Sequence, residues 1–172
     1  MFYGNGTARL VRNSKWRDNG GGVLPDLGSH LIDTCCFWFG SELSDFQLTA
    51  AHYFENRAPD HVIISSEENK PRIELEMTLC MWRNHFTCDI LAENGTAHIE
   101  SLCKWGPSTF THRVRVFPSG RPPETKVTLV QSDPTWTSEY DHFKSLVESN
   151  ICSDLSKDYW LQNQLRLLGE GI

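Results

Sequence analysis

The sequence predicts an α+β domain: an open, mostly antiparallel β-sheet with helices packed on one face. Three observations lead to this prediction. Apolar residues recur at helical spacing over residues 25–39, alternate with a period of two between about residues 46 and 131, and return to helical spacing after residue 137. A block of strands between helical segments is typical of this class, and no linker divides residues 1–172, so we expect a single domain.

The N-terminal third begins with strand and loop and continues into a helix. Residues 2–12 are expected to be strand and loop, and residues 13–22 are expected to be loop. The helix follows because Pro25 has the backbone geometry of a first helical turn and lacks an N–H that would need a partner there. Gly40 suits the position just past its last turn.

The middle of the chain alternates like a sheet. Ile73, Leu75 and Met77 alternate with polar residues, and the pattern continues through Trp82, so one strand is predicted over residues 73–82. Asn94-Gly95 predicts the turn of a hairpin over residues 86–100. Other strands are expected at 46–54, 61–65, 113–117 and 126–131, and C-terminal helices at 137–149 and 156–168.

The face of this sheet away from the helices is expected to have little polar character. Cys80 and Trp82 would point to that face, because their parity is opposite to that of Ile73 and Leu75. Since helices cover only one face, the other face predicts a homo-oligomer that buries it against a second copy.

Composition excludes several classes of protein. The net charge is −6 with no basic cluster, which disfavours nucleic-acid binding. No run of 18 apolar residues predicts a membrane span, and the N-terminus lacks the pattern of a signal peptide. The six cysteines form no C-x-x-C pair, so we interpret them as reduced thiols of a cytoplasmic protein.

The first helix carries a candidate catalytic site. Leu27, Leu31, Cys35 and Trp38 share one helical stripe, and a neighbouring stripe holds Asp26, His30, Asp33 and Phe37. A carboxylate one turn from an imidazole can orient it for general acid–base chemistry. The run of glycines at residues 20–22 would let a ligand approach the backbone closely.

Two other interpretations of this pattern stay open. An Asp near a helix start is often a dipole partner, and a His beside it is often a plain surface pair. The spacing D-x3-H-x2-D of Asp26, His30 and Asp33 could instead supply three metal ligands on one face.

The stretch "WRDNGGGVLPDLGSHLIDTCCFWFG", residues 16–40, resembles the segment that opens the C-terminal domain of the Gfo/Idh/MocA oxidoreductases. The matching positions are Gly20, Gly21, Gly22, Asp26, Gly28, His30 and Asp33. The strand-rich middle and the helical tail are also similar to that domain. The resemblance implies an open sheet with helices on one face that shapes the substrate site and the oligomer interface.

The resemblance also implies roles for individual residues. His30 would be the acid–base on a substrate hydroxyl and Asp26 would assist it, in an enzyme that uses NAD or NADP on a sugar, polyol or related hydroxy compound. Trp16 and Arg17 lie near the motif in the sequence, so we expect them to line the substrate pocket with Asp33; a surface position for Arg17 is the alternative. Which substrate the pocket takes depends on loop side chains that the sequence does not place.

The sequence lacks the other half of such an enzyme. The resemblance implies a catalytic lysine in a Glu-Lys-Pro motif of the Rossmann domain, and this sequence has no such motif. The segment "YGNGTA" at residues 3–8 has only two of the three glycines of a dinucleotide-binding fingerprint. We therefore expect the chain to be a C-terminal domain without its Rossmann domain, inactive and without cofactor by itself. The alternatives are a non-enzymatic binding or oligomerisation module with this fold, or a metal-dependent enzyme.

Overall fold

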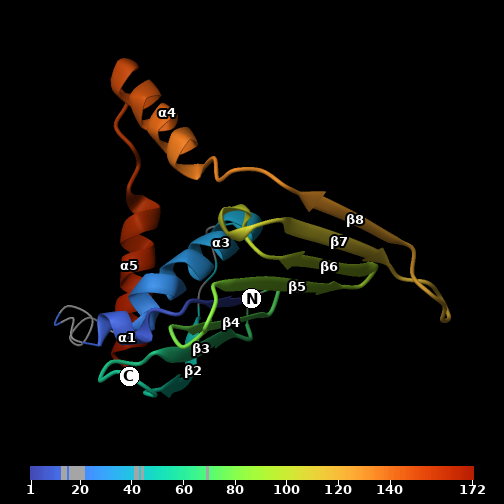
Figure 1. Cartoon of the computed structure of the whole chain (residues 1–172), viewed down its shortest axis with the longest axis horizontal. Coiled ribbons are helices and arrows are strands. Elements are labelled where there is room, and N and C mark those ends of the chain that lie inside the picture. The colour runs from blue at the N-terminus through green and yellow to red at the C-terminus, as the bar shows by residue number, and fades with distance from the viewer. Residues whose placement is uncertain (13–14, 16–21, 41–42, 44, 69) are drawn as a thin grey trace. The chain divides into compact units, whose positions relative to one another are not determined.

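The computed structural model describes residues 1–12, 15, 22–40, 43, 45–68 and 70–172. The chain divides into two compact units, which are described separately below. The first unit comprises Met1–Cys88 and Asp158–Ile172, and the second comprises Asp89–Lys157. Figure 1 labels most of the helices and strands.

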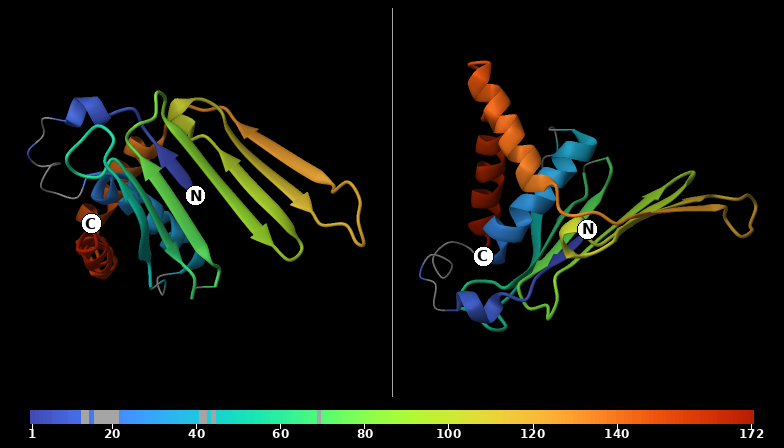
Figure 2. Two further views of the ribbon diagram at one scale, coloured as in Figure 1. Left: turned by 90° about the horizontal axis from the view of Figure 1, so that it is seen from below. Right: turned by 45° about the horizontal axis from the view of Figure 1, so that its top comes forward.

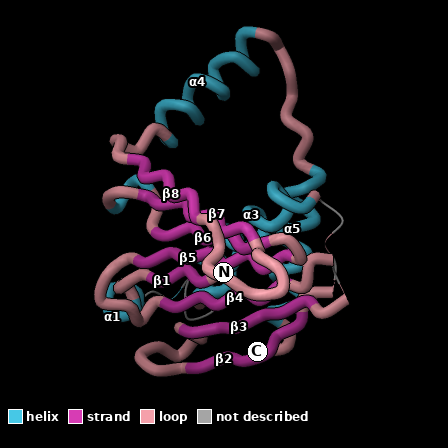
Figure 3. The backbone as a smooth tube through the Cα atoms, turned by 90° about the vertical axis from the view of Figure 1, so that its right-hand side faces the viewer, coloured by secondary structure: helices cyan, strands magenta, loops and turns pink. Residues whose placement is uncertain are grey.

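The sheet of the first unit has the hydrogen-bonded strand order β2-β3-β4-β1-β5, which can be followed in Figure 3. The bounds of the strands are β1 Phe2–Gly4, β2 Gln47–His52, β3 His61–Ser66, β4 Ile73–Thr78 and β5 His85–Ala92. β1 runs parallel to β4, and the other pairs described in this unit are antiparallel. The sheet is therefore mostly antiparallel, as the sequence predicted.

Strand alternation divides this sheet into a core face and an outer face. Val62 and Ile64 on β3 pair with Met77 and Leu75 on β4, and all four side chains are fully buried. Their neighbours along the strands point the opposite way. On the outer face, His61, Glu74 and Glu76 are at least partly exposed, together with Ile63, Thr49 and Ser65, so this face is mostly polar in the first unit.

Helices cover the core face of the first unit (Figure 2). A short helix, α1, spans Ala8–Val11. A π-helical turn, η1, spans Leu24–Gly28 and leads directly into α3, Ser29–Phe39. The C-terminal helix α5 spans Ser156–Gly169 and buries Leu168. The expected arrangement of helices on one face of the sheet is confirmed.

The second unit continues from β5 with an antiparallel ladder and one helix. β6 Gly95–Glu100, β7 Ser108–Val114 and β8 Glu124–Leu129 pair in that order, and a 3-10 turn at Cys103–Trp105 joins the first two. α4 spans Thr135–Glu148. Four apolar side chains of this helix are each more than 60% exposed: Trp136, Tyr140, Phe143 and Val147.

The prediction that Cys80 and Trp82 lie on a strand is wrong. β4 ends at Thr78, and both residues lie in the connection to β5, where Trp82 is 98% exposed. The backbone explains the early end of the strand. Leu79 donates its N–H to the Asp60 carbonyl, and Met81 donates its N–H to the Asn5 carbonyl, so these groups have loop partners.

The hairpin over residues 86–100 forms, but its turn lies at residues 93 and 94, one position earlier than expected. Gly95 is instead the first residue of β6. There, a Cβ atom would lie 2.2 Å from the Arg113 carbonyl oxygen, so glycine permits the close approach of β7. β7 itself starts five residues before the predicted strand at 113–117, and ends at Val114, opposite Gly95.

No disulfide joins any of the six cysteines, all of which lie within the described residues. Burial raises the pKa of the Cys35 thiol to about 12. Burial, and after it the negative charge of Asp60, raises the pKa of the Cys80 thiol to about 11. These two thiols are therefore protonated and weakly nucleophilic at neutral pH. Within the described ranges, no helix has the length and apolar character needed to cross a membrane.

Candidate functional site

The helix that carries the candidate residues does not begin as the sequence predicted. Asp26 lies in the π-helical turn, and the regular α-helix starts only at Ser29, just before His30. A projection at 100° per residue therefore applies to His30 and Asp33 but does not describe Asp26. Single π-helical turns are rare and are frequent at functional sites.

The predicted division into a core stripe and a polar stripe is observed in part, because Trp38, the fourth residue expected in the core stripe, is 36% exposed. Leu27, Leu31 and Cys35 are at most 2% exposed, and they fix the helix on the sheet. His30 and Asp33 are exposed beside this stripe, and Asp26 is half-buried. The helix thus holds an imidazole at the surface on a rigid, well-anchored element.

His30 also lies beside an aromatic ring that the sequence did not single out. The ring of Tyr3 on β1 has its centroid 6.2 Å from that of His30, at an interplanar angle of 53°. Tyr3 is itself buried and makes an edge contact with Phe86 on β5. No local pattern could reveal this neighbour, because the contact joins residues far apart in the chain.

Two glycines bring the candidate helix close to the sheet and its loops. Gly22 has a φ of +63°, and a Cβ atom there would lie 2.0 Å from the carbonyl oxygen of Pro59. At Gly28, a Cβ atom would lie 2.9 Å from the Met77 sulfur on β4. The last glycine of the run at 20–22 therefore has a packing role, which the sequence alone had suggested only as space for a ligand.

The described residues include only some of the positions expected to contact substrate. Trp16 and Arg17, proposed from the sequence to contact substrate, lie outside the described residues, as do Gly20 and Gly21. Asp33, the third expected substrate residue, is exposed on α3 beyond His30. The structure therefore locates the acid–base candidates and one of the three expected substrate contacts.

The geometry gives no support to a metal site at Asp26, His30 and Asp33. In the described part of the chain, no three His, Cys, Asp or Glu side chains form a group that could hold a metal ion.

The residues of the "YGNGTA" segment do not fit a dinucleotide. Cβ atoms at Gly4 and Gly6 would each lie 2.4 Å from an atom of Met81, so both glycines serve packing within the protein. The helix after them has only four residues, and the N–H of Ala8 at its start donates to the Leu79 carbonyl. The amide at the start of this helix, which would face a pyrophosphate, is thus engaged within the protein.

The fold and the helix at residues 24–39 define this chain as a C-terminal domain of an oxidoreductase family. The family model described as the GFO/IDH/MocA C-terminal domain matches residues 2–98, which include Asp26 and His30. The chain belongs to this family. No match to a curated protein reaches significance.

Solved structures show the same fold at low sequence identity. A candidate NADPH-dependent oxidoreductase from Desulfitobacterium hafniense is 14% identical and superposes with a TM-score of 0.74, covering 99% of this chain and 54% of that one. A candidate oxidoreductase from Yersinia pestis is 13% identical with a TM-score of 0.71, covering 98% and 52%. This chain therefore spans about half the length of those proteins.

Proposed function

We propose that this chain is the substrate-side domain of an NAD(P)-dependent oxidoreductase that acts on a sugar, a polyol or a related hydroxy compound. The observation that carries the proposal is His30, an exposed imidazole on a helix fixed by buried residues, within the segment matched by the family model. Asp33 and the residues Trp16 and Arg17 would contact the substrate.

The chemistry assigned to His30 is proton transfer. Nicotinamide cofactors accept a hydride from carbon, so the substrate hydroxyl must lose its proton in the same oxidation. The exposed imidazole takes that proton as a general base and returns it in the reverse direction. Asp26, four residues earlier in the π-helical turn, is the group proposed to orient the ring. The Tyr3 ring at 6.2 Å restricts how the imidazole can move.

The cofactor would be bound by a part of the enzyme outside this chain. We expect isothermal titration of the chain with NAD and with NADP to give no binding in the micromolar range, because Gly4 and Gly6 are occupied by packing against Met81. A protein that joins this chain to a Rossmann domain is the positive control. Micromolar binding of either dinucleotide by the chain itself would contradict this assignment.

We further propose that the chain forms homo-oligomers through an apolar sheet face in the second unit. Ile99, Phe110 and Val127 are cross-strand neighbours on one face of β6, β7 and β8, and the last two are 43% and 55% exposed. The sequence had based self-association on Cys80 and Trp82, which lie outside the strands, so we now base it on this face. Large exposed apolar patches commonly mark interaction sites.

A charge on this face is expected to weaken association. Light scattering should give a mass near twice the 19.7 kDa of one chain, and Val127→Lys should shift it toward the monomer. Thr128→Lys, on the opposite face of the same strand, is the matched control and should leave the mass unchanged. A monomeric wild-type chain, or equal effects of both variants, would contradict the proposal.

A further inference from the structure

We propose that the buried carboxylate of Asp60 is a positioning residue for His30. This inference rests on the proposed function, because it concerns the same site. Asp60 closes the loop of residues 53–60 between β2 and β3, here called the 53–60 loop. The carboxylate fixes this loop, and the loop in turn holds the start of the helix that carries Asp26 and His30.

The carboxylate of Asp60 accepts hydrogen bonds from three backbone amides. Asp60 is completely buried. Its Oδ1 accepts the N–H of Phe54 at 2.9 Å, and its Oδ2 accepts the N–H groups of Glu55 and Asn56 at 2.6 and 3.0 Å. A buried charge is tolerated only where such donors compensate it, so these three amides and the carboxylate depend on one another.

The backbone of Asp60 also forms hydrogen bonds with the sheet. The N–H of Asp60 donates to the His52 carbonyl on β2 at 3.0 Å. Its carbonyl accepts the N–H of Leu79 at 2.8 Å and the hydroxyl of Thr78 at 3.1 Å. The 53–60 loop is therefore anchored to the end of β2 and to the end of β4.

The 53–60 loop forms a hydrogen bond with the start of the candidate helix. The N–H of Val23 donates to the Pro59 carbonyl at 2.9 Å, and Gly22 packs against the same peptide. Val23 and Leu24 are buried, and η1 begins at Leu24. His30 lies six residues farther along this helical segment. A shift of Pro59 therefore displaces the first turn of the segment that presents the imidazole.

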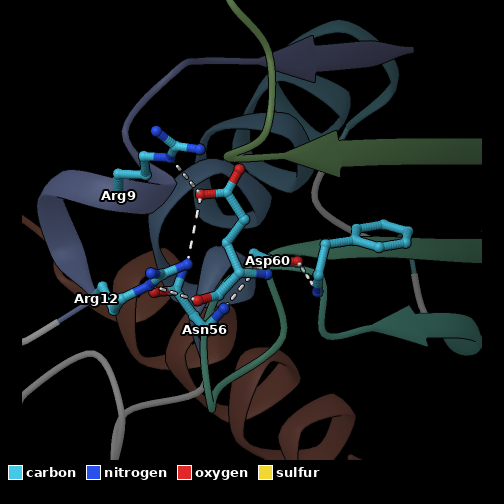
Figure 4. A network of polar contacts seen from close by, with 6 residues as sticks. Arg9, Arg12, Asn56 and Asp60 are labelled. Carbon is cyan, nitrogen blue, oxygen red and sulfur yellow. Dashed lines mark hydrogen bonds and ion pairs between the residues drawn. The ribbon is translucent and has the colours of Figure 1, made fainter.

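Two arginines, one in α1 and one just after it, also contact the 53–60 loop (Figure 4). Arg12 donates its Nε–H to the Glu55 carbonyl at 2.9 Å, and Arg9 forms an ion pair with the Glu55 carboxylate at 3.3 Å. The arginines are more than half exposed, so each contact is weak by itself. The hydrogen bond from the Glu55 amide to Asp60 positions the backbone of Glu55 for its contacts with both arginines.

The decisive variant is Asp60→Asn. Its amide group keeps the volume but presents an N–H₂ donor to at least one of the three backbone donors, so the loop must shift. Ile64→Val is the matched control. Ile64 is equally buried, and on β4 it pairs with Leu75, which is outside the 53–60 loop. Both variants are compared in the chain under conditions where each is folded.

The readout is the imidazole itself. Histidine-ring NMR spectra, assigned with His30→Asn, should show shifted His30 ring signals and shifted amide signals of Gly22 and Val23 in Asp60→Asn, with little change in Ile64→Val. Unmoved His30 signals in a folded Asp60→Asn chain would overturn the proposal. This measurement needs no activity, so its outcome is separate from that of the proposed function.

Activity gives a second readout in the two-domain enzyme. Asp60→Asn should lower kcat by about 10- to 100-fold and displace the pH profile of kcat, because a misplaced base loses proximity. Ile64→Val should leave both nearly unchanged. Equal effects of the two variants on kcat and on the pH profile would assign Asp60 a role in stability alone and overturn the proposal.

If Asp60→Asn does not fold, hydrogen exchange in the wild-type chain tests the same coupling. The amides of Val23, Phe54, Glu55 and Asn56 should exchange within about threefold of one common opening constant, because one event exposes them all. A difference of tenfold or more between Val23 and the three loop amides would overturn the proposal.

Discussion

In an enzyme that joins this chain to a Rossmann domain, replacing His30 by Asn is expected to lower turnover by about 10²-fold or more, the usual contribution of a positioned general base. Asparagine keeps part of the size and hydrogen bonding of the imidazole but cannot take a proton. The fold should be retained, because His30 is exposed and the helix is held by Leu27, Leu31 and Cys35. Steady-state kinetics across pH measures the effect.

The controls for this experiment come from the same chain. His142→Asn removes another exposed histidine, on α4, and should leave turnover unchanged. Asp26→Asn should cost less than His30→Asn, because it alters the orientation of the base and leaves the base present. Near wild-type turnover of His30→Asn with an unchanged pH profile would show that His30 is only a surface residue.

Replacing Gly22 by Ala is expected to lower the free energy of unfolding by about 2–4 kcal/mol. The methyl group would meet the Pro59 carbonyl oxygen at 2.0 Å, and the backbone φ of +63° is itself unfavourable for alanine. Urea unfolding followed by far-ultraviolet circular dichroism measures the change.

Gly40→Ala separates the two causes. Gly40 also has a positive φ, of +94°, but a Cβ atom there would contact nothing within 4 Å. We expect it to cost about 1–3 kcal/mol from the backbone alone, because a φ of +94° with a ψ of 167° lies in a region that is essentially restricted to glycine. A Gly22→Ala chain no less stable than Gly40→Ala would show that the contact with Pro59 is easily relaxed, which would also weaken the link between the 53–60 loop and His30.

Local periodicity was sufficient to predict the class of fold and the division of the candidate helix. Alternation of Ile73, Leu75 and Met77 placed these residues on the buried face, where the structure has them. Helical spacing separated Leu31 and Cys35 from His30, and this division is also observed. Such features follow from the sequence because side-chain direction repeats with each element's own period.

The ends of the strands required partners that no local pattern contains. The alternation in the sequence continues to Trp82, but the strand stops at Thr78 because the next amides bond to Asp60 and Asn5. Asn94-Gly95 signalled a hairpin correctly, while the close approach of Arg113 placed the glycine in the strand. Strand pairing decides such details, and pairing is a property of residues far apart in the chain.

The candidate site shows the same division. The sequence by itself determined that Asp26, His30 and Asp33 belong to one helical segment, and its motif identified the family to which the chain belongs. Only the tertiary structure decided that Asp26 lies in a π-helical turn, that Tyr3 lies beside His30, and that Asp60 organises the loop holding Gly22. In the sequence, Asp60 is an ordinary acid after a turn-rich segment; its role arises from hydrogen bonds to backbone groups that folding alone brings around it.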